Sequence, residues 1–122
     1  MIWIVGGAAL SICFFISACT YHSKEVEYPS DSCDTAAVTY SGSIVPLFTQ
    51  NCYKCRSGSA VNGNGVRLDV YASAKAYALF GSMLQMVNHQ AGFVAMPKDA
   101  PKLSDCNIAK IRIWIEAGAP NN

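Results

Sequence analysis

The chain has 122 residues, of which 52% are hydrophobic and 14% are charged. This composition is sufficient for one folded domain and excludes an intrinsically disordered chain. The formal net charge is +1, whereas nucleic-acid-binding domains normally carry a basic surface, so the charge argues against a nucleic-acid partner.

The N-terminal segment differs in composition from the rest, because no Lys, Arg, Asp or Glu occurs before residue 20. A short apolar run that ends in small residues is typical of a secretory signal. The tetrapeptide ISAC at 16–19 resembles a bacterial lipobox, which implies cleavage before Cys19 and a lipid on that cysteine. An uncleaved anchor helix is the alternative, at the short limit for a membrane span. We predict a lipoprotein signal over 1–18 and a polar tether over 19–33, on the periplasmic or cell-surface side of a bacterial envelope.

The segment SGSIVPLFTQN, residues 41–51, predicts the first helix of a domain that spans residues 34–122. Ser43 is placed to cap this helix, and Pro46 falls in its first turn, where the missing N–H costs little. The apolar residues of the segment recur at helical spacing. The helix leads directly into the cysteine pair of residues 52–55.

Two loops and two short helices follow the cysteine pair. Residues 56–69 contain several glycines and predict a loop. Short helices are predicted over 73–81 and 82–88, and the first of them ends at a glycine. Two prolines and a glycine predict a second loop over 89–102.

The clearest helical pattern lies near the C-terminus. Ser104 is placed as its N-cap, and Leu103 is placed to pack onto Ile108. Isoleucines at 108, 111 and 115 form one apolar face, and Gly118 and Pro120 end the helix. No stretch shows the alternation of a β-strand, so the sequence predicts an all-α domain.

Cysteine usage narrows the chemistry. Of six cysteines, one lies in the signal and one carries the predicted lipid, which leaves four in or beside the domain: Cys33, Cys52, Cys55 and Cys106. Four cysteines permit three disulfide pairings, and an oxidising compartment favours such bonds.

The motif CYKCR at residues 52–56 places two thiols three positions apart, and Met96 precedes a proline in the later loop. In this order of parts the chain from about residue 34 to 122 resembles the class I c-type cytochromes, especially lipoprotein-tethered ones. The segments that carry the resemblance are YSGSIVPLFTQNCYKC, MPKDAPKLSD and CNIAKIRIWIEAGAPNN.

The resemblance implies a small cytochrome c-like helical fold with covalently bound haem c. Cys52 and Cys55 match the thioether positions, and Met96 matches the distal ligand of the haem iron. Cys33 and Cys106 match a disulfide. The implied protein is an electron carrier that serves an unidentified redox partner protein and is not an enzyme.

Arg56 departs from the family pattern, because it stands where the family has an iron-ligating histidine. A guanidinium is cationic and has no lone pair for iron, so Arg56 is a cofactor-contacting candidate and not a ligand. In one interpretation haem is attached with Met96 on one side and another group opposite. His89 is a conceivable substitute, although we favour a surface or haem-propionate contact for it. In another interpretation, the arginine at position 56 reflects a sequence change at one codon.

A third interpretation keeps the fold without haem. Cys52 and Cys55 would then form a disulfide or a free pair, Lys54 and Arg56 would be solvated charges, and the role would be structural or an interaction. Met83 and Met86, three positions apart in a predicted helix, are predicted as core residues.

Two other classes of function use close-spaced cysteines. A thiol–disulfide oxidoreductase normally places C-x-x-C between a strand and a helix, and a depressed Cys52 pKa would support that class. A zinc site built from the four domain cysteines has the right ligand number but lacks a second close-spaced pair.

Overall fold

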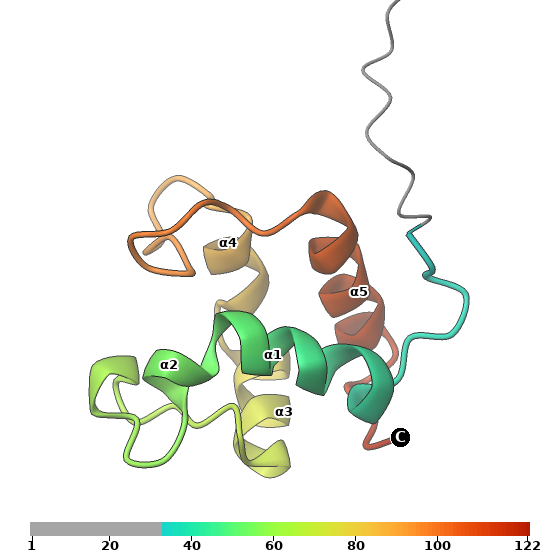
Figure 1. Cartoon of the computed structure of the whole chain (residues 1–122), viewed down its shortest axis with the longest axis horizontal. Coiled ribbons are helices and arrows are strands. Elements are labelled where there is room, and N and C mark those ends of the chain that lie inside the picture. The colour runs from blue at the N-terminus through green and yellow to red at the C-terminus, as the bar shows by residue number, and fades with distance from the viewer. Residues whose placement is uncertain (1–32) are drawn as a thin grey trace, which may run out of the picture. The chain divides into compact units, whose positions relative to one another are not determined.

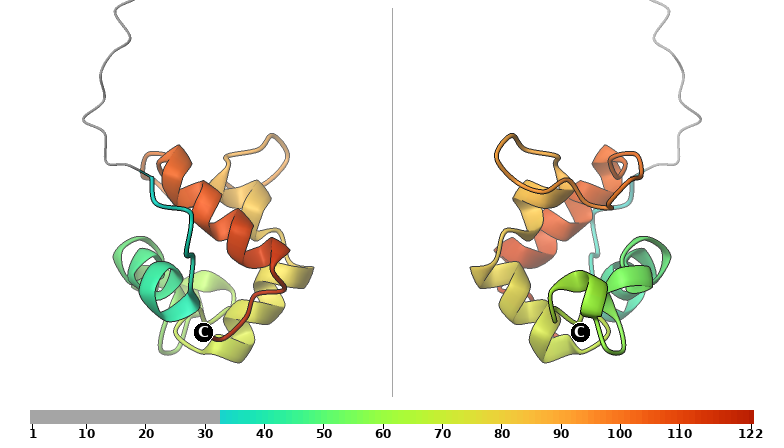
Figure 2. Two further views of the ribbon diagram at one scale, coloured as in Figure 1. Left: turned by 90° about the vertical axis from the view of Figure 1, so that its right-hand side faces the viewer. Right: turned by 90° about the vertical axis from the view of Figure 1, so that its left-hand side faces the viewer.

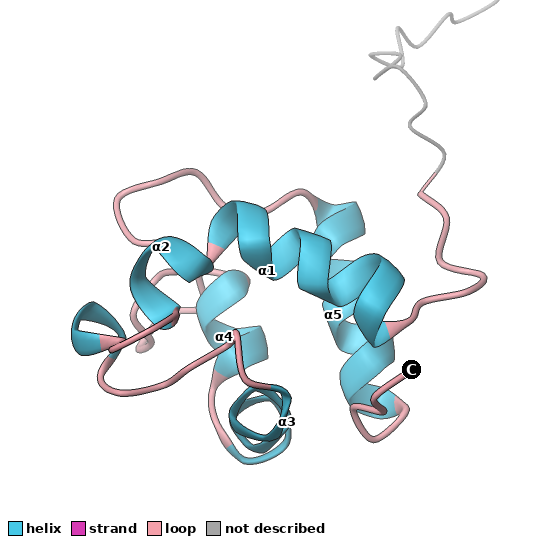
Figure 3. Cartoon of the chain, turned by 60° about the horizontal axis from the view of Figure 1, so that its bottom comes forward, coloured by secondary structure: helices cyan, strands magenta, loops and turns pink. Residues whose placement is uncertain are grey.

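Residues 33–122 are described by a computed structural model, in which helices are the only regular elements of this range. The all-α prediction is therefore confirmed for the described residues (Figure 3). The predicted signal, the predicted lipidation site Cys19 and nearly all of the predicted tether lie outside them. Within residues 33–122, no helix has both the length and the apolar character needed to cross a membrane.

Seven helical elements occur in residues 33–122 (Figure 1). They are the π-helical η1 (Tyr40–Ile44), α1 (Val45–Asn51), α2 (Tyr53–Arg56), the 3-10 turn η2 (Val61–Gly63), α3 (Tyr71–Phe80), α4 (Met83–Val87) and α5 (Asp105–Glu116). The loops that follow α2 and α4 project to the same side of the molecule, away from α5 (Figures 1 and 3).

The first predicted helix is present, but its cap is Thr39 and not Ser43. Thr39 Oγ1 accepts a hydrogen bond from the Gly42 N–H at 3.1 Å. Ser43 Oγ accepts one from the Thr39 N–H at 3.3 Å. This reciprocal pair satisfies two backbone donors, as in a capping box. The prediction of Ser43 was wrong because the helix begins at Tyr40, four residues before the start that a cap at Ser43 implies, with the π-helical turn η1.

The core forms where η1 and α1 meet α5. Trp114, Phe48, Ile44 and Ile111 are the largest fully buried side chains. The Trp114 ring stacks on Tyr40 with centroids 5.3 Å apart. The helix α5 packs against η1 and α4, and crosses the domain diagonally in the views of Figure 2. Burial of such aromatic surface is the main source of stability in a domain of this size.

The region after the cysteines differs in part from the prediction. Residue 56 ends the short helix α2 and does not begin a loop, and the loop contains the turn η2. The next two helices are present, and Gly81 separates them as predicted.

The helix α5 and its cap agree with the prediction. Ser104 Oγ accepts a hydrogen bond from the Asn107 N–H at 3.2 Å. Leu103 and Ile108 are both buried, and Gly118 adopts a φ of 85°, which few other residues tolerate. The chain after α5 is held by the Trp114 indole, which donates to the Pro120 carbonyl at 2.9 Å.

A disulfide joins Cys33 to Cys106, the pair that the family resemblance implied. The two Cα atoms are 5.5 Å apart, and 73 positions separate the residues in sequence. The bond therefore fixes the segment that precedes η1 to the start of α5.

Candidate functional site

The CYKCR motif occupies the junction of α1 and α2. Cys52 lies between the two helices and Cys55 lies within α2. Both side chains are partly buried, and both thiols are free. The two cysteines are therefore available for chemistry that does not involve Cys33 or Cys106.

Burial controls the acidity of Cys52. Desolvation raises the pKa of its thiol from 9.0 to about 11, and the nearby Arg56 charge opposes this shift only in part. A raised pKa leaves the sulfur protonated at neutral pH. This shift is the opposite of the depressed pKa that a thiol–disulfide oxidoreductase requires.

Arg56 is buried, with 8% of its surface exposed. The expectation that Arg56 is a solvated charge was therefore wrong, whereas Lys54 is exposed as expected. The guanidinium donates from Nη1 to the Gly63 carbonyl at 3.0 Å, and its carbon lies 5.0 Å from the centroid of the Tyr77 ring. A hydrogen-bonded carbonyl and an aromatic face together offset the cost of burying this cation.

Arg56 also closes the loop that follows it. Its carbonyl accepts a hydrogen bond from the Leu68 N–H at 2.7 Å, while its side chain reaches Gly63 in the middle of the loop. A Cβ on Gly63 would lie 2.9 Å from Arg56 Cγ and 2.7 Å from the Cys55 carbonyl. Only glycine permits this close approach. The burial of Arg56 against the loop therefore requires a glycine at position 63.

Met96 lies in the loop after α4 and is held there by its backbone. Its N–H donates to the Met86 carbonyl at 3.0 Å, and its carbonyl lies 3.1 Å from His89 Nε2. His89 is thus a partly buried residue that contacts the main chain of Met96. Met83 is in the core as predicted, whereas Met86 is only partly buried.

Tyr77 connects Arg56 to the methionine loop, and the sequence did not reveal this role. Its ring faces Arg56, and its hydroxyl donates to Met86 Sδ at 2.8 Å. Tyr77 is an ordinary aromatic residue within a helical pattern. The only available signal was its position on the helix between the C-x-x-C motif and the methionine loop, which predicts no particular contact.

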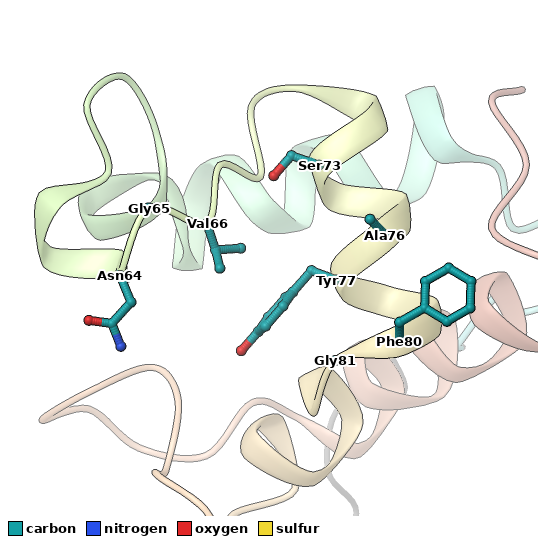
Figure 4. A pocket seen from close by; sticks show the side chains of 8 residues that line it. All are labelled: Asn64, Gly65, Val66, Ser73, Ala76, Tyr77, Phe80 and Gly81. Carbon is teal, nitrogen blue, oxygen red and sulfur yellow. The ribbon is translucent and has the colours of Figure 1, made fainter.

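An open pocket of about 390 Å³ lies beside α3, and the Tyr77 side chain extends across it (Figure 4). Its lining consists of Asn64, Gly65, Val66, Ser73, Ala76, Tyr77, Phe80 and Gly81. None of the predicted site residues lines the pocket. Tyr77 is the connection, because it lines the pocket and also contacts Arg56.

The donor groups meet part of what haem c requires. Two free thiols three positions apart fit covalent attachment, and the Met96 thioether is of a type that ligates haem iron. The Arg56 guanidinium does not fit an axial ligand, because it has no lone pair and is held between Gly63 and Tyr77. The residues therefore fit attachment and one axial ligand, and residue 56 does not supply the second.

The zinc alternative is not supported by the cysteines of the domain. Cys33 and Cys106 are consumed in a disulfide, so four thiolates are not available together. Among residues 33–122, no three His, Cys, Asp or Glu side chains are grouped so that they could hold a metal ion.

A comparison with protein-family models finds no match for this chain, and comparisons with curated proteins and with solved structures find none either. A function is therefore inferred from the chemistry of the motif and from the contacts within residues 33–122. Three features of this range bear on the function: a free cysteine pair, a buried arginine, and a methionine loop held by its backbone.

Proposed function

We propose that this protein is a membrane-tethered electron carrier of the c-type cytochrome kind, with haem attached through Cys52 and Cys55. The observation that supports this most is the division of the domain cysteines. Cys33 and Cys106 form a disulfide, while the C-x-x-C pair stays free. In an oxidising compartment, a free pair at thioether spacing is explained by a group that both sulfurs bind.

Each residue of the proposed site has a defined role. Cys52 and Cys55 would hold the haem through their sulfurs, and the Met96 thioether would ligate its iron. Bound haem supplies reversible one-electron chemistry, which a chain of ordinary side chains lacks. Cys52 itself is partly buried, and this desolvation raises the pKa of its unattached thiol.

The proposed carrier acts at a membrane surface. Lipid on Cys19 would tether it, and residues 20–32 would give the domain reach on the outer side of a bacterial envelope. Lys54 is exposed between the two cysteines, and its charge favours an acidic surface on a redox partner protein.

A second candidate is the same lipid-tethered domain without haem, with a structural or interaction role. The burial of Arg56 favours it, because the side chain at the position of the expected ligand is committed to Gly63 and Tyr77. A haem-free domain needs no axial ligand, and its C-x-x-C pair is the remnant of an attachment site.

The first prediction separates the two candidates. The full chain is produced in a bacterial host that attaches haem to c-type cytochromes, and its intact mass and visible spectrum are recorded. We expect a covalent haem adduct on the natural sequence and a larger haem-bearing fraction in Arg56→His, because imidazole supplies the missing ligand.

The control for this experiment is Cys52→Ala/Cys55→Ala, which should carry no covalent haem. If the natural sequence carries none either while Arg56→His does, the electron-carrier proposal is overturned in favour of the haem-free domain. If Arg56→His also lacks haem, the family interpretation itself is wrong.

A further inference from the structure

Tyr77 lies at the centre of a continuous series of contacts between the C-x-x-C helix and the methionine loop. On one side its ring faces the Arg56 guanidinium at 5.0 Å. On the other its hydroxyl donates to Met86 Sδ at 2.8 Å. The Met86 carbonyl in turn accepts the Met96 N–H at 3.0 Å.

The ring of Tyr77 is confined by its neighbours. A Cβ on Gly81 would lie 2.6 Å from Tyr77 Cδ2, so the chain at the end of α3 passes directly against the ring. Figure 4 shows the side chain extending from α3 toward the segment of Asn64 and Val66. Contacts at the face, one edge and the hydroxyl of the ring favour a single rotamer of Tyr77, so the position of one contact affects the other.

We infer that Tyr77 is a positioning residue, which sets where the Met96 loop lies relative to the C-x-x-C helix. Its hydroxyl fixes Met86 and thereby the amide of Met96, and its ring fixes the Arg56 side chain. This role rests on the proposed function, in which Met96 is an iron ligand. The coupling itself is a property of the haem-free domain and is tested in that state.

Tyr77→Phe tests the inference, because it keeps the ring and removes only the hydroxyl. Hydrogen exchange is measured at the Met96 and Leu68 amides in the full chain, produced without haem attachment. We expect exchange at Met96 to become about three- to tenfold faster, which corresponds to the loss of one modest hydrogen bond. Exchange at Leu68, whose N–H is bonded to the Arg56 carbonyl, should stay within twofold of the natural protein.

The chain offers a matched control on the same helix. Tyr71 also donates through its hydroxyl, to the Ala119 carbonyl at 2.8 Å, but has no place in the Tyr77 contacts. Tyr71→Phe should leave the Met96 amide unchanged. A general loosening of α3 would instead accelerate Met96 in both variants, and that result would overturn the inference.

Arg56→Met tests the other end of the series, since it removes the guanidinium and keeps an unbranched side chain. It should also accelerate exchange at Met96, although Arg56 does not contact Met96. If exchange at Met96 in Tyr77→Phe stays within twofold of that in the natural protein, the inference is overturned. Neither result depends on haem, so the outcome is separate from that of the proposed function.

Discussion

Arg56 is a buried cation that takes part in no ion pair within residues 33–122, where the salt bridges are Arg67–Asp69 and Lys102–Asp105. Its burial is tolerable because one donor meets a carbonyl and the flat guanidinium faces an aromatic ring. Removing the guanidinium would take one of two donors from the buried Gly63 carbonyl, which also accepts the Val66 N–H at 3.1 Å. The loss is that of one hydrogen bond from a charged donor, about 1.5–3 kcal/mol in stability. The same residue cannot make these contacts and also ligate iron.

The reactivity of Cys52 provides a prediction at the residue scale. Because burial raises its pKa from 9.0 to about 11, the thiolate fraction at neutral pH should be about a hundredfold below that of an ordinary thiol. Alkylation by iodoacetamide, followed by mass in Cys55→Ser produced without haem attachment, should accelerate about tenfold per pH unit until pH 11. In a further Arg56→Gln variant the midpoint should move higher, because the charge that lowers the pKa is gone. A midpoint at or below pH 9 would contradict this prediction.

The helix α5 contributes more buried residues to the core than any other helix of the described range, and nearby residues in the sequence specify it. Three of its residues, Ile108, Ile111 and Trp114, are buried on one face. Its N-cap is provided within the same segment, by Ser104. Local patterns of this kind make the element recognisable from sequence, since spacing and cap are read over a few residues.

Capping at α5 leads to a prediction at the element scale. Ser104→Ala should lower the free energy of unfolding by about 1 kcal/mol, because the Asn107 N–H loses its side-chain acceptor. Ser82→Ala is the matched control, since Ser82 occupies the N-cap position of α4 without making a capping hydrogen bond. Urea unfolding measures both variants. Equal losses would show that the Ser104 hydroxyl does not stabilise α5 as a cap.

At the scale of the whole molecule, the disulfide holds together segments that are far apart in sequence. Cys33 lies seven positions before the start of η1, and Cys106 lies in the first turn of α5. The closed loop contains every other helix of residues 33–122. Such a bond acts mainly by restricting the unfolded chain.

Removing this bond should therefore destabilise the whole domain. Cys33→Ala/Cys106→Ala should lower the free energy of unfolding by about 2–4 kcal/mol. The measurement is urea unfolding, made with Cys52 and Cys55 both replaced by serine so that neither thiol of the C-x-x-C pair can exchange with the disulfide. Reductant should destabilise the disulfide-bearing protein and leave the double-alanine variant unchanged. If the bond has no effect on stability, packing without it is sufficient to hold the segment that precedes η1.

Much of the candidate site could be identified from the sequence, because its motif is contiguous. C-x-x-C and Met-Pro are each recognised within a few residues, and the resemblance of their order to that of c-type cytochromes makes Cys52, Cys55 and Met96 candidates. The contacts of these residues could not be predicted. Met96 is held by Met86 and His89 through main-chain atoms, and such contacts carry no side-chain signature in the sequence.

By itself the sequence determined the helical class, the last helix with its cap, and the cysteine pair, since each depends on local spacing and propensity. Only the tertiary structure decided that Arg56 is buried and that Tyr77 connects it to the methionine loop. The physical reason is that a charge is buried where distant segments supply its partners. Gly63 and Tyr77 reach Arg56 only after the loop closes and α3 packs beside it.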